Sequence, residues 1–313
     1  MEHQKQRIEF YRQRTFTEKM NATFEFIREN WKPLLKYSFY LIMPVCLVQS
    51  LAMNAFFNSY NNIKDFTQES PIAANSDVYG FIANYGIWML CMLIGMSIIS
   101  GMIYAMMQTY SVRENKLENL QLDDFKNLLI RNTWKYIRIM LALILYSFVA
   151  LMLIVMMMTP GASSTLITIV ITIALLACLV PLLMMIPVYI FERDITFLNA
   201  IGKAWRFGSK TLGGLIGLVV VMNVIASVIR SVTMMPWYAG AAIGTFLSSS
   251  SNQHVTQSVA YKFGMYLLGL IQAYGMYVSM IIGVIAIAFH YFHAREKIEG
   301  VTIDSNISNF DEL

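Results

Sequence analysis

Long apolar runs alternate with short polar segments along the whole of this 313-residue chain. A helix rises about 1.5 Å per residue, so a run of about 20 apolar residues crosses the roughly 30 Å hydrocarbon core of a bilayer. The pattern therefore predicts an all-α, polytopic membrane protein with six transmembrane helices. The predicted spans are residues 34–57, 80–107, 137–158, 164–190, 212–235 and 263–290.

Composition strengthens this prediction and excludes one class of partner. Hydrophobic residues make up 57% of the chain and charged residues only 13%, whereas soluble domains carry roughly 25% charged residues. The net charge is +4, and the basic residues stand beside the ends of apolar runs instead of forming one stripe. We therefore expect membrane lipids, and not nucleic acid, as partners. Any membrane-protein partner is left open.

The distribution of Lys and Arg predicts the orientation, because short basic loops stay on the cytoplasmic side of the membrane. Basic residues gather in the segment 1–33 and in the loops after the second and fourth spans, while the odd-numbered loops have few. Both termini are then cytoplasmic, with residues 294–313 as a tail. No cleavable signal peptide is expected, so the first span itself directs insertion into the cytoplasmic membrane of the cell.

An amphipathic stretch precedes each odd-numbered span. These stretches are residues 15–32, 123–135 and 194–210, and we expect each to be a helix lying at the membrane surface. Thr15 and Glu18 fit a capping box, and Asp123 and Asp194 are the expected N-caps of the other two helices. The aromatic side chains expected to anchor these helices are Phe16, Phe24, Trp31, Trp134 and Trp205.

The recurrence suggests three repeats, each a surface helix followed by a transmembrane hairpin. The repeats would cover roughly residues 15–107, 120–191 and 194–293. The alternative is convergence, since any short cytoplasmic loop between spans tends to be basic and amphipathic.

Two of the amphipathic stretches carry a resemblance. Residues 16–35, FTEKMNATFEFIRENWKPLL, are echoed by residues 195–213, ITFLNAIGKAWRFGSKTLG. This pattern resembles the bacterial membrane domain that is attached to some glycerophosphodiester phosphodiesterases. The resemblance implies a multi-pass membrane domain whose free-standing relatives have no established activity. The short tail after Arg295 holds no catalytic barrel, so phosphodiesterase activity is not implied.

Ionisable residues inside spans usually mark function, and here they are scarce. No Asp or Glu occurs in any predicted span, which argues against proton-coupled transport and paired-carboxylate catalysis. Arg230 either reaches the outer headgroups or forms an anionic-substrate or lipid-headgroup site with Asn223 and Gln272. The two amides alternatively make helix-to-helix hydrogen bonds or line a polar path.

Other candidate chemistry is weak. His290 and His293 share a helix face with Glu296 one turn on, which is either nominal metal-ligand spacing or a polar rim at the headgroups. We predict no catalytic residue, no metal and no cofactor. Residues 236–247 are too apolar for an ordinary loop and form either a re-entrant segment or, through Trp237 and Tyr238, an aromatic belt.

Three functions follow, in order of preference. The first is a non-catalytic membrane component that organises lipids or proteins. The second is a transporter or flippase-like protein for an amphiphilic or uncharged substrate. The third is an intramembrane enzyme that acts on lipid.

Overall fold

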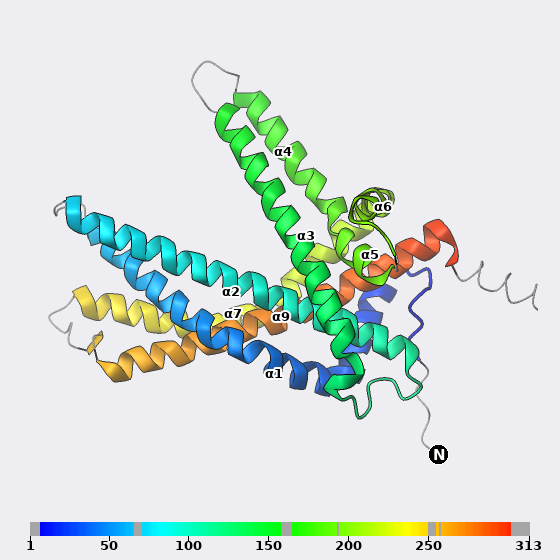
Figure 1. Ribbon diagram of the computed structural model, residues 1–313, viewed down its shortest axis with the longest axis horizontal. Helices are drawn as coiled ribbons and strands as arrows, with labels where there is room; N and C mark the ends of the chain where they lie inside the picture. Colours follow the sequence, from blue (N-terminus) through cyan, green and yellow to red (C-terminus); the bar gives the residue numbers. More distant parts are fainter. Residues whose placement is uncertain are drawn as a thin grey trace, which may run out of the picture. The chain divides into compact units, whose positions relative to one another are not determined.

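The computed structural model describes residues 7–65, 71–157, 165–192, 194–249, 255–256 and 258–301, and within these it contains helices and no strand (Figure 1). The helices are α1 (Phe16–Asp65), α2 (Pro71–Val112), α3 (Leu122–Met157), α4 (Thr165–Leu182), α5 (Met185–Phe191), α6 (Phe197–Lys210), α7 (Leu212–Ser249) and α9 (Val259–Glu299).

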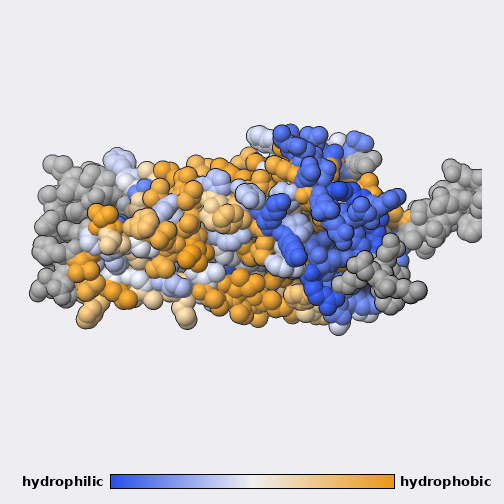
Figure 2. Space-filling view, turned by 90° about the horizontal axis from the view of Figure 1, so that it is seen from below, coloured by the Kyte–Doolittle hydropathy of each residue, from blue (hydrophilic) through white to orange (hydrophobic). Residues whose placement is uncertain are grey.

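Among the described residues, six helical stretches are long and apolar enough to cross a membrane, which confirms the predicted fold class. They are Phe16–Ser59, Val78–Val112, Leu122–Val155, Ile169–Phe191, Leu212–Leu247 and Val259–Glu299. Figure 2 shows hydrophobic side chains over much of the visible surface and hydrophilic side chains gathered on one part of it. The predicted turn between the third and fourth spans and the tail after residue 301 lie outside the described residues.

The chain divides into two compact units. Unit 1 comprises residues 1–33, 100–223 and 282–313, and unit 2 comprises residues 34–99 and 224–281. Four of the long helices contribute a part to each unit, and each unit is described separately below.

Unit 2 contains parts of α1, α2, α7 and α9, joined by buried hydrogen bonds. The Tyr277 hydroxyl donates to Gln49 Oε1 on α1 and, at 3.1 Å, to the carbonyl oxygen of Cys91 on α2. Trp237 Nε1 on α7 donates to Asn54 Oδ1 at 3.1 Å. Because hydrocarbon offers no hydrogen-bonding partner, such polar groups satisfy each other across helices.

In unit 1, α3 and α4 lie side by side and α6 packs against α4 and α5 (Figure 1). The α4 helix ends at Leu182, one residue after Pro181, and α5 begins three residues later, at Met185. Gly208 of α6 lies against Pro181, where an added Cβ would collide with the proline backbone. This close approach explains why a glycine stands at position 208.

The first predicted helix start is confirmed. The Thr15 amide donates to Glu18 Oε2 at 2.7 Å, and the Glu18 amide donates to Thr15 Oγ1 at 3.4 Å, which is a capping box.

The other two predicted N-caps are wrong. The α3 helix begins at Leu122, before Asp123, and it is Asp124 whose carboxylate accepts from the Gln121 amide at 2.8 Å. The N-cap of α6 is Thr196, whose side chain accepts from the Asn199 amide and whose backbone is extended, as is typical of an N-cap. Asp194 lies two residues earlier and has a left-handed φ of 60°.

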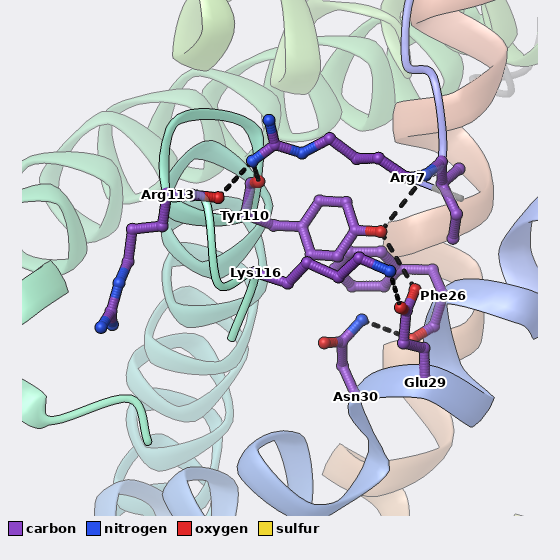
Figure 3. Close-up of polar contacts among 8 residues, drawn as sticks. Arg7, Phe26, Glu29, Asn30, Tyr110, Arg113 and Lys116 are labelled. Carbon is purple, nitrogen blue, oxygen red and sulfur yellow. Dashed lines mark hydrogen bonds and ion pairs between the residues drawn. The ribbon is translucent and has the colours of Figure 1, made fainter. Parts of the chain in front are cut away.

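The three predicted surface stretches differ in how they join their spans. The first is continuous with its span in α1, with a kink at Asn30 (φ −117°, ψ 20°). There, Asn30 Nδ2 donates to the Phe26 carbonyl at 2.9 Å (Figure 3). The second is continuous with α3, and only the third is a separate helix, α6.

Residues 236–249 continue α7 as a helix through Pro236, so they are neither a loop nor irregular backbone. Trp237 is 1% exposed and its ring centroid lies 4.6 Å from that of Phe57, so it packs inside unit 2 and does not anchor a headgroup. Tyr238, at 53% exposed, faces outward. The predicted aromatic belt is therefore wrong for Trp237, and for the exposed Tyr238 it stays a prediction.

Candidate lipid anchors and a cationic hollow

All five predicted aromatic anchors lie on the surface of unit 1. The exposed fractions are 51% for Trp31, 60% for Trp134 and 46% for Trp205, with Phe16 and Phe24 at 38% and 36%. On α6, Leu198 is also exposed, while Ala200, Ala204 and Phe207 are buried. Large aromatic side chains therefore point outward on each of the three predicted surface stretches.

The three predicted polar site residues make separate contacts. Asn223 is exposed, and its amide donates to the Val219 carbonyl of its own helix at 2.9 Å. Arg230 and Gln272, both in unit 2, are half-buried and share no hydrogen bond. Gln272 Oε1 is buried and has no hydrogen-bond partner within the described residues.

A polar cluster fixes the N-terminal segment of unit 1 to α1 and α2. Arg7 donates to the carbonyl oxygens of Tyr110, at 2.6 Å, and of Arg113, at the carboxyl end of α2 (Figure 3). The Tyr110 hydroxyl donates to Glu29 Oε2 at 3.0 Å, and Lys116 pairs with Glu29 Oε1. Arg7 thereby satisfies carbonyl groups that the end of a helix leaves open.

A second charged cluster joins α6 to the end of α9. Lys203 Nζ lies 2.8 Å from Glu192 Oε1 and 2.9 Å from Glu299 Oε1, and Arg295 Nε lies 3.4 Å from Glu299 Oε2. Two basic and two acidic side chains neutralise one another in this cluster. We therefore interpret it as a structural contact between helices and not as a binding site.

A third group of charges is different, because it contains bases only. It surrounds a hollow of about 310 Å³ in unit 1, which we call the cationic hollow. Its lining is Lys19, residues 209–214, His290, His293 and Lys297. Lys210 belongs to this lining, so three lysines and two histidines meet here, and none of the described residues in the lining is a carboxylate.

Lys19 is the buried base of the hollow. Its side chain lies within α1, is only 4% exposed, and has Nζ 3.3 Å from His290 Nδ1. No carboxylate among the described residues forms an ion pair with Lys19, Lys210 or Lys297. A buried ammonium group without a counter-charge is costly, which sets this lysine apart from the paired Lys203.

The hydrogen bonds around His290 have a defined direction. The Thr211 hydroxyl donates to the Phe207 carbonyl at 2.8 Å, so its oxygen accepts from His290 Nε2 at 3.0 Å. His290 Nδ1 is then the acceptor for the Lys19 ammonium group. Both ring nitrogens of His290 are thus engaged, and no group of three His, Cys, Asp or Glu suited to a metal occurs among the described residues.

His293 also lines the hollow, and only one of its two ring nitrogens is engaged by the described residues. Its Nδ1 accepts from the backbone amide of Arg14 at 2.9 Å, which places the proton of the neutral ring on Nε2. That N–H group has no protein acceptor within the described residues.

The first turn of α7 forms part of the wall. The Leu215 amide donates to the Thr211 carbonyl at 3.0 Å, so the amides of residues 212–214 have no acceptor in this helix. The Thr211 hydroxyl would usually cap them, but it is bonded to Phe207 and His290. An added Cβ on Gly214 would lie 3.4 Å from both Lys19 Nζ and His290 Cε1, so the helix end lies close to these bases.

Sequence reasoning found only part of this site. The spacing of His290 and His293 marked them as neighbours, but Lys19 lies in the stretch 15–32 that was predicted as a surface helix, and that prediction did not mark it as buried. The pair Gly213 and Gly214, which follows Thr211 and Leu212, is the local signal that could have marked an open helix start.

Comparisons with protein-family models, with curated proteins and with solved structures find no match to this chain.

Proposed function

We propose that this chain is a non-catalytic component of the cytoplasmic membrane that organises the lipids around it. The observation that carries the proposal is the set of exposed tryptophans Trp31, Trp134 and Trp205, one on each predicted surface stretch. Tryptophan rings favour the headgroup level, where one part of the ring is apolar and the indole N–H reaches water.

The charge pattern supports a cytoplasmic position for these stretches. Each is flanked by the basic residues that predict the orientation, and α6 itself carries Lys203, Arg206 and Lys210. Basic amphipathic segments bind the negative surface of a membrane through combined apolar and electrostatic attraction. In this orientation both termini are cytoplasmic.

The polar groups inside unit 2 favour packing over a transport path. Gln49 is 2% exposed and accepts from Tyr277, so this amide is bonded within the bundle. The predicted spans contain no Asp or Glu, which speaks against carboxylate chemistry within the bilayer.

Lipid analysis of the protein in its native membrane tests the proposal. The chain is extracted together with its surrounding lipids by a membrane-solubilising polymer, and their composition is compared with that of the whole membrane. We expect anionic lipids to be enriched around the wild type, and less so around the variant with Trp31→Ala, Trp134→Ala and Trp205→Ala together.

The control carries Leu145→Ala, Phe148→Ala and Leu151→Ala, which remove exposed apolar side chains from the second half of α3. Enrichment should survive in this control. A wild-type lipid shell with the composition of the whole membrane would contradict the proposed function.

A further inference from the structure

The cationic hollow gathers positive charges that no carboxylate among the described residues neutralises. Lys19 is 4% exposed, and within the described part of the chain its only side-chain hydrogen-bond partner is an uncharged nitrogen of His290. Lys210 and Lys297 stand exposed in the same lining. Since burial of an unpaired ammonium group is unfavourable, an anion in the hollow would remove this cost.

The donors in the hollow match an anion with several oxygens. Besides the ammonium groups, the lining offers the amides of residues 212–214 and the proton on His293 Nε2. The amino end of α7 adds a favourable partial positive charge for a bound anion. Phosphate oxygens accept from such a mixture of ammonium and backbone donors.

From these contacts we infer that the cationic hollow binds a phosphate group, with Lys19 as its buried counter-charge. Thr211 and His290 act as positioning residues, because their hydrogen-bonded chain holds Lys19 beside the start of α7. The hollow of about 310 Å³ is at the small end of ligand sites, which span roughly 300–1,000 Å³. It therefore fits a headgroup better than a large soluble ligand.

The phosphate belongs either to a lipid headgroup or to a small soluble compound. The first source rests on the proposed function, since lipid organisation supplies the ligand, and the second does not. The binding chemistry is the same in both cases, so the probes must separate them.

The experiment uses the purified full-length chain in maltoside micelles and phosphate-free buffer. Three probes are added separately: phosphatidate, diacylglycerol with the same acyl chains, and inorganic phosphate. Native mass spectrometry counts bound lipid, and the apparent unfolding temperature reports binding of every probe, because a ligand that binds only the folded state stabilises it. We expect phosphatidate to bind and stabilise the wild type and diacylglycerol not to.

The variant Lys19→Met should weaken phosphatidate binding about tenfold or more, which corresponds to the loss of one charge-assisted hydrogen bond. The double variant of the exposed rim, Lys210→Met with Lys297→Met, should also weaken phosphatidate binding. If Lys19→Met does not fold, this double variant tests the inference in its place. Lys126→Met is the control, since Lys126 is an exposed base of unit 1 outside the hollow.

Wild-type affinity in both the Lys19 and rim variants would overturn the inference, as would equal binding of diacylglycerol or no binding of either phosphate probe. If phosphatidate binds but does not depend on these lysines, the phosphate site fails while lipid organisation can stand. If inorganic phosphate binds through Lys19 and phosphatidate does not, the phosphate site is supported, and a lipid headgroup is excluded as its ligand.

Discussion

The Tyr110 hydroxyl donates a hydrogen bond of 3.0 Å to Glu29 Oε2, and the other oxygen of the same carboxylate pairs with Lys116 (Figure 3). The Glu29 side chain therefore binds both the carboxyl end of α2, through Tyr110, and the segment that follows α2, through Lys116. Glu29 is half-buried within unit 1, where its ion pair is less screened than one in open solvent.

Glu29→Gln should loosen the segment after α2, because it removes the charge that pairs with Lys116 and keeps an acceptor for Tyr110. A loss of about 1 kcal/mol is expected for this partly exposed pair, which makes local opening roughly fivefold more frequent. Trypsin cleavage after Arg113 or Lys116, followed over time, measures that opening.

Glu25→Gln is the matched control for this experiment, since it makes the same change at an exposed position one turn earlier on α1. It should cleave at the wild-type rate. Equal rates for both variants would show that the Glu29 carboxylate does not hold this segment.

The pair Tyr277 and Gln49 should be energetically coupled inside unit 2. Tyr277→Phe and Gln49→Leu each remove one side of a buried hydrogen bond and leave the other without its partner. A double-mutant cycle on unfolding in detergent should give a coupling energy of about 0.6 kcal/mol, and at most about 1.7 kcal/mol, as for other hydrogen bonds between transmembrane helices. Strictly additive effects would show that the bond contributes nothing to stability.

Stability should fall at alkaline pH through Tyr11. Burial raises the pKa of its phenol above the usual 10.0, although the nearby Arg295 opposes this shift. The folded protein thus disfavours the tyrosinate, so this contribution to stability is present below about pH 10 and is lost as the pH rises further. Apparent unfolding temperatures measured across this range should drop less steeply for Tyr11→Phe than for the wild type.

Tyr79→Phe is the control for this pH dependence, because Tyr79 is 72% exposed. It should follow the wild-type curve. An unchanged slope in Tyr11→Phe would assign the alkaline loss to other groups.

The transmembrane helices were predictable because the thickness of the bilayer sets their minimum length. The capping box of Thr15 and Glu18 was predictable because it involves only four consecutive residues. The choice between Asp194 and Thr196 as N-cap depended on backbone geometry, since Asp194 turns left-handed and Thr196 is extended at ψ 156°. Composition alone does not distinguish these two positions. Composition also does not mark the kink at Asn30, where the side-chain amide donates to the Phe26 carbonyl.

The cationic hollow was out of reach of local patterns. Lys19 and His290 are separated by 271 positions, and only the packing of α1 against α9 within unit 1 brings them together. A lysine on an amphipathic helix ordinarily faces solvent, so its sequence neighbours gave no sign of burial. The aromatic anchors were easier, because exposure at helical spacing follows from the sequence of each stretch alone.

The orientation can be decided by labelling. Asn115→Cys lies in the basic segment after α2 and Ser258→Cys lies just before α9, in the predicted outer loop. Each is introduced into a chain in which Cys46, Cys91 and Cys178 are replaced by Ala. With both termini in the cytoplasm, a membrane-impermeant maleimide added to intact cells should label position 258 and reach position 115 only after the membrane is permeabilised. Labelling of position 115 in intact cells, with position 258 protected, would reverse the orientation and move the basic surface stretches to the outer face, where the attraction to the anionic cytoplasmic leaflet no longer applies.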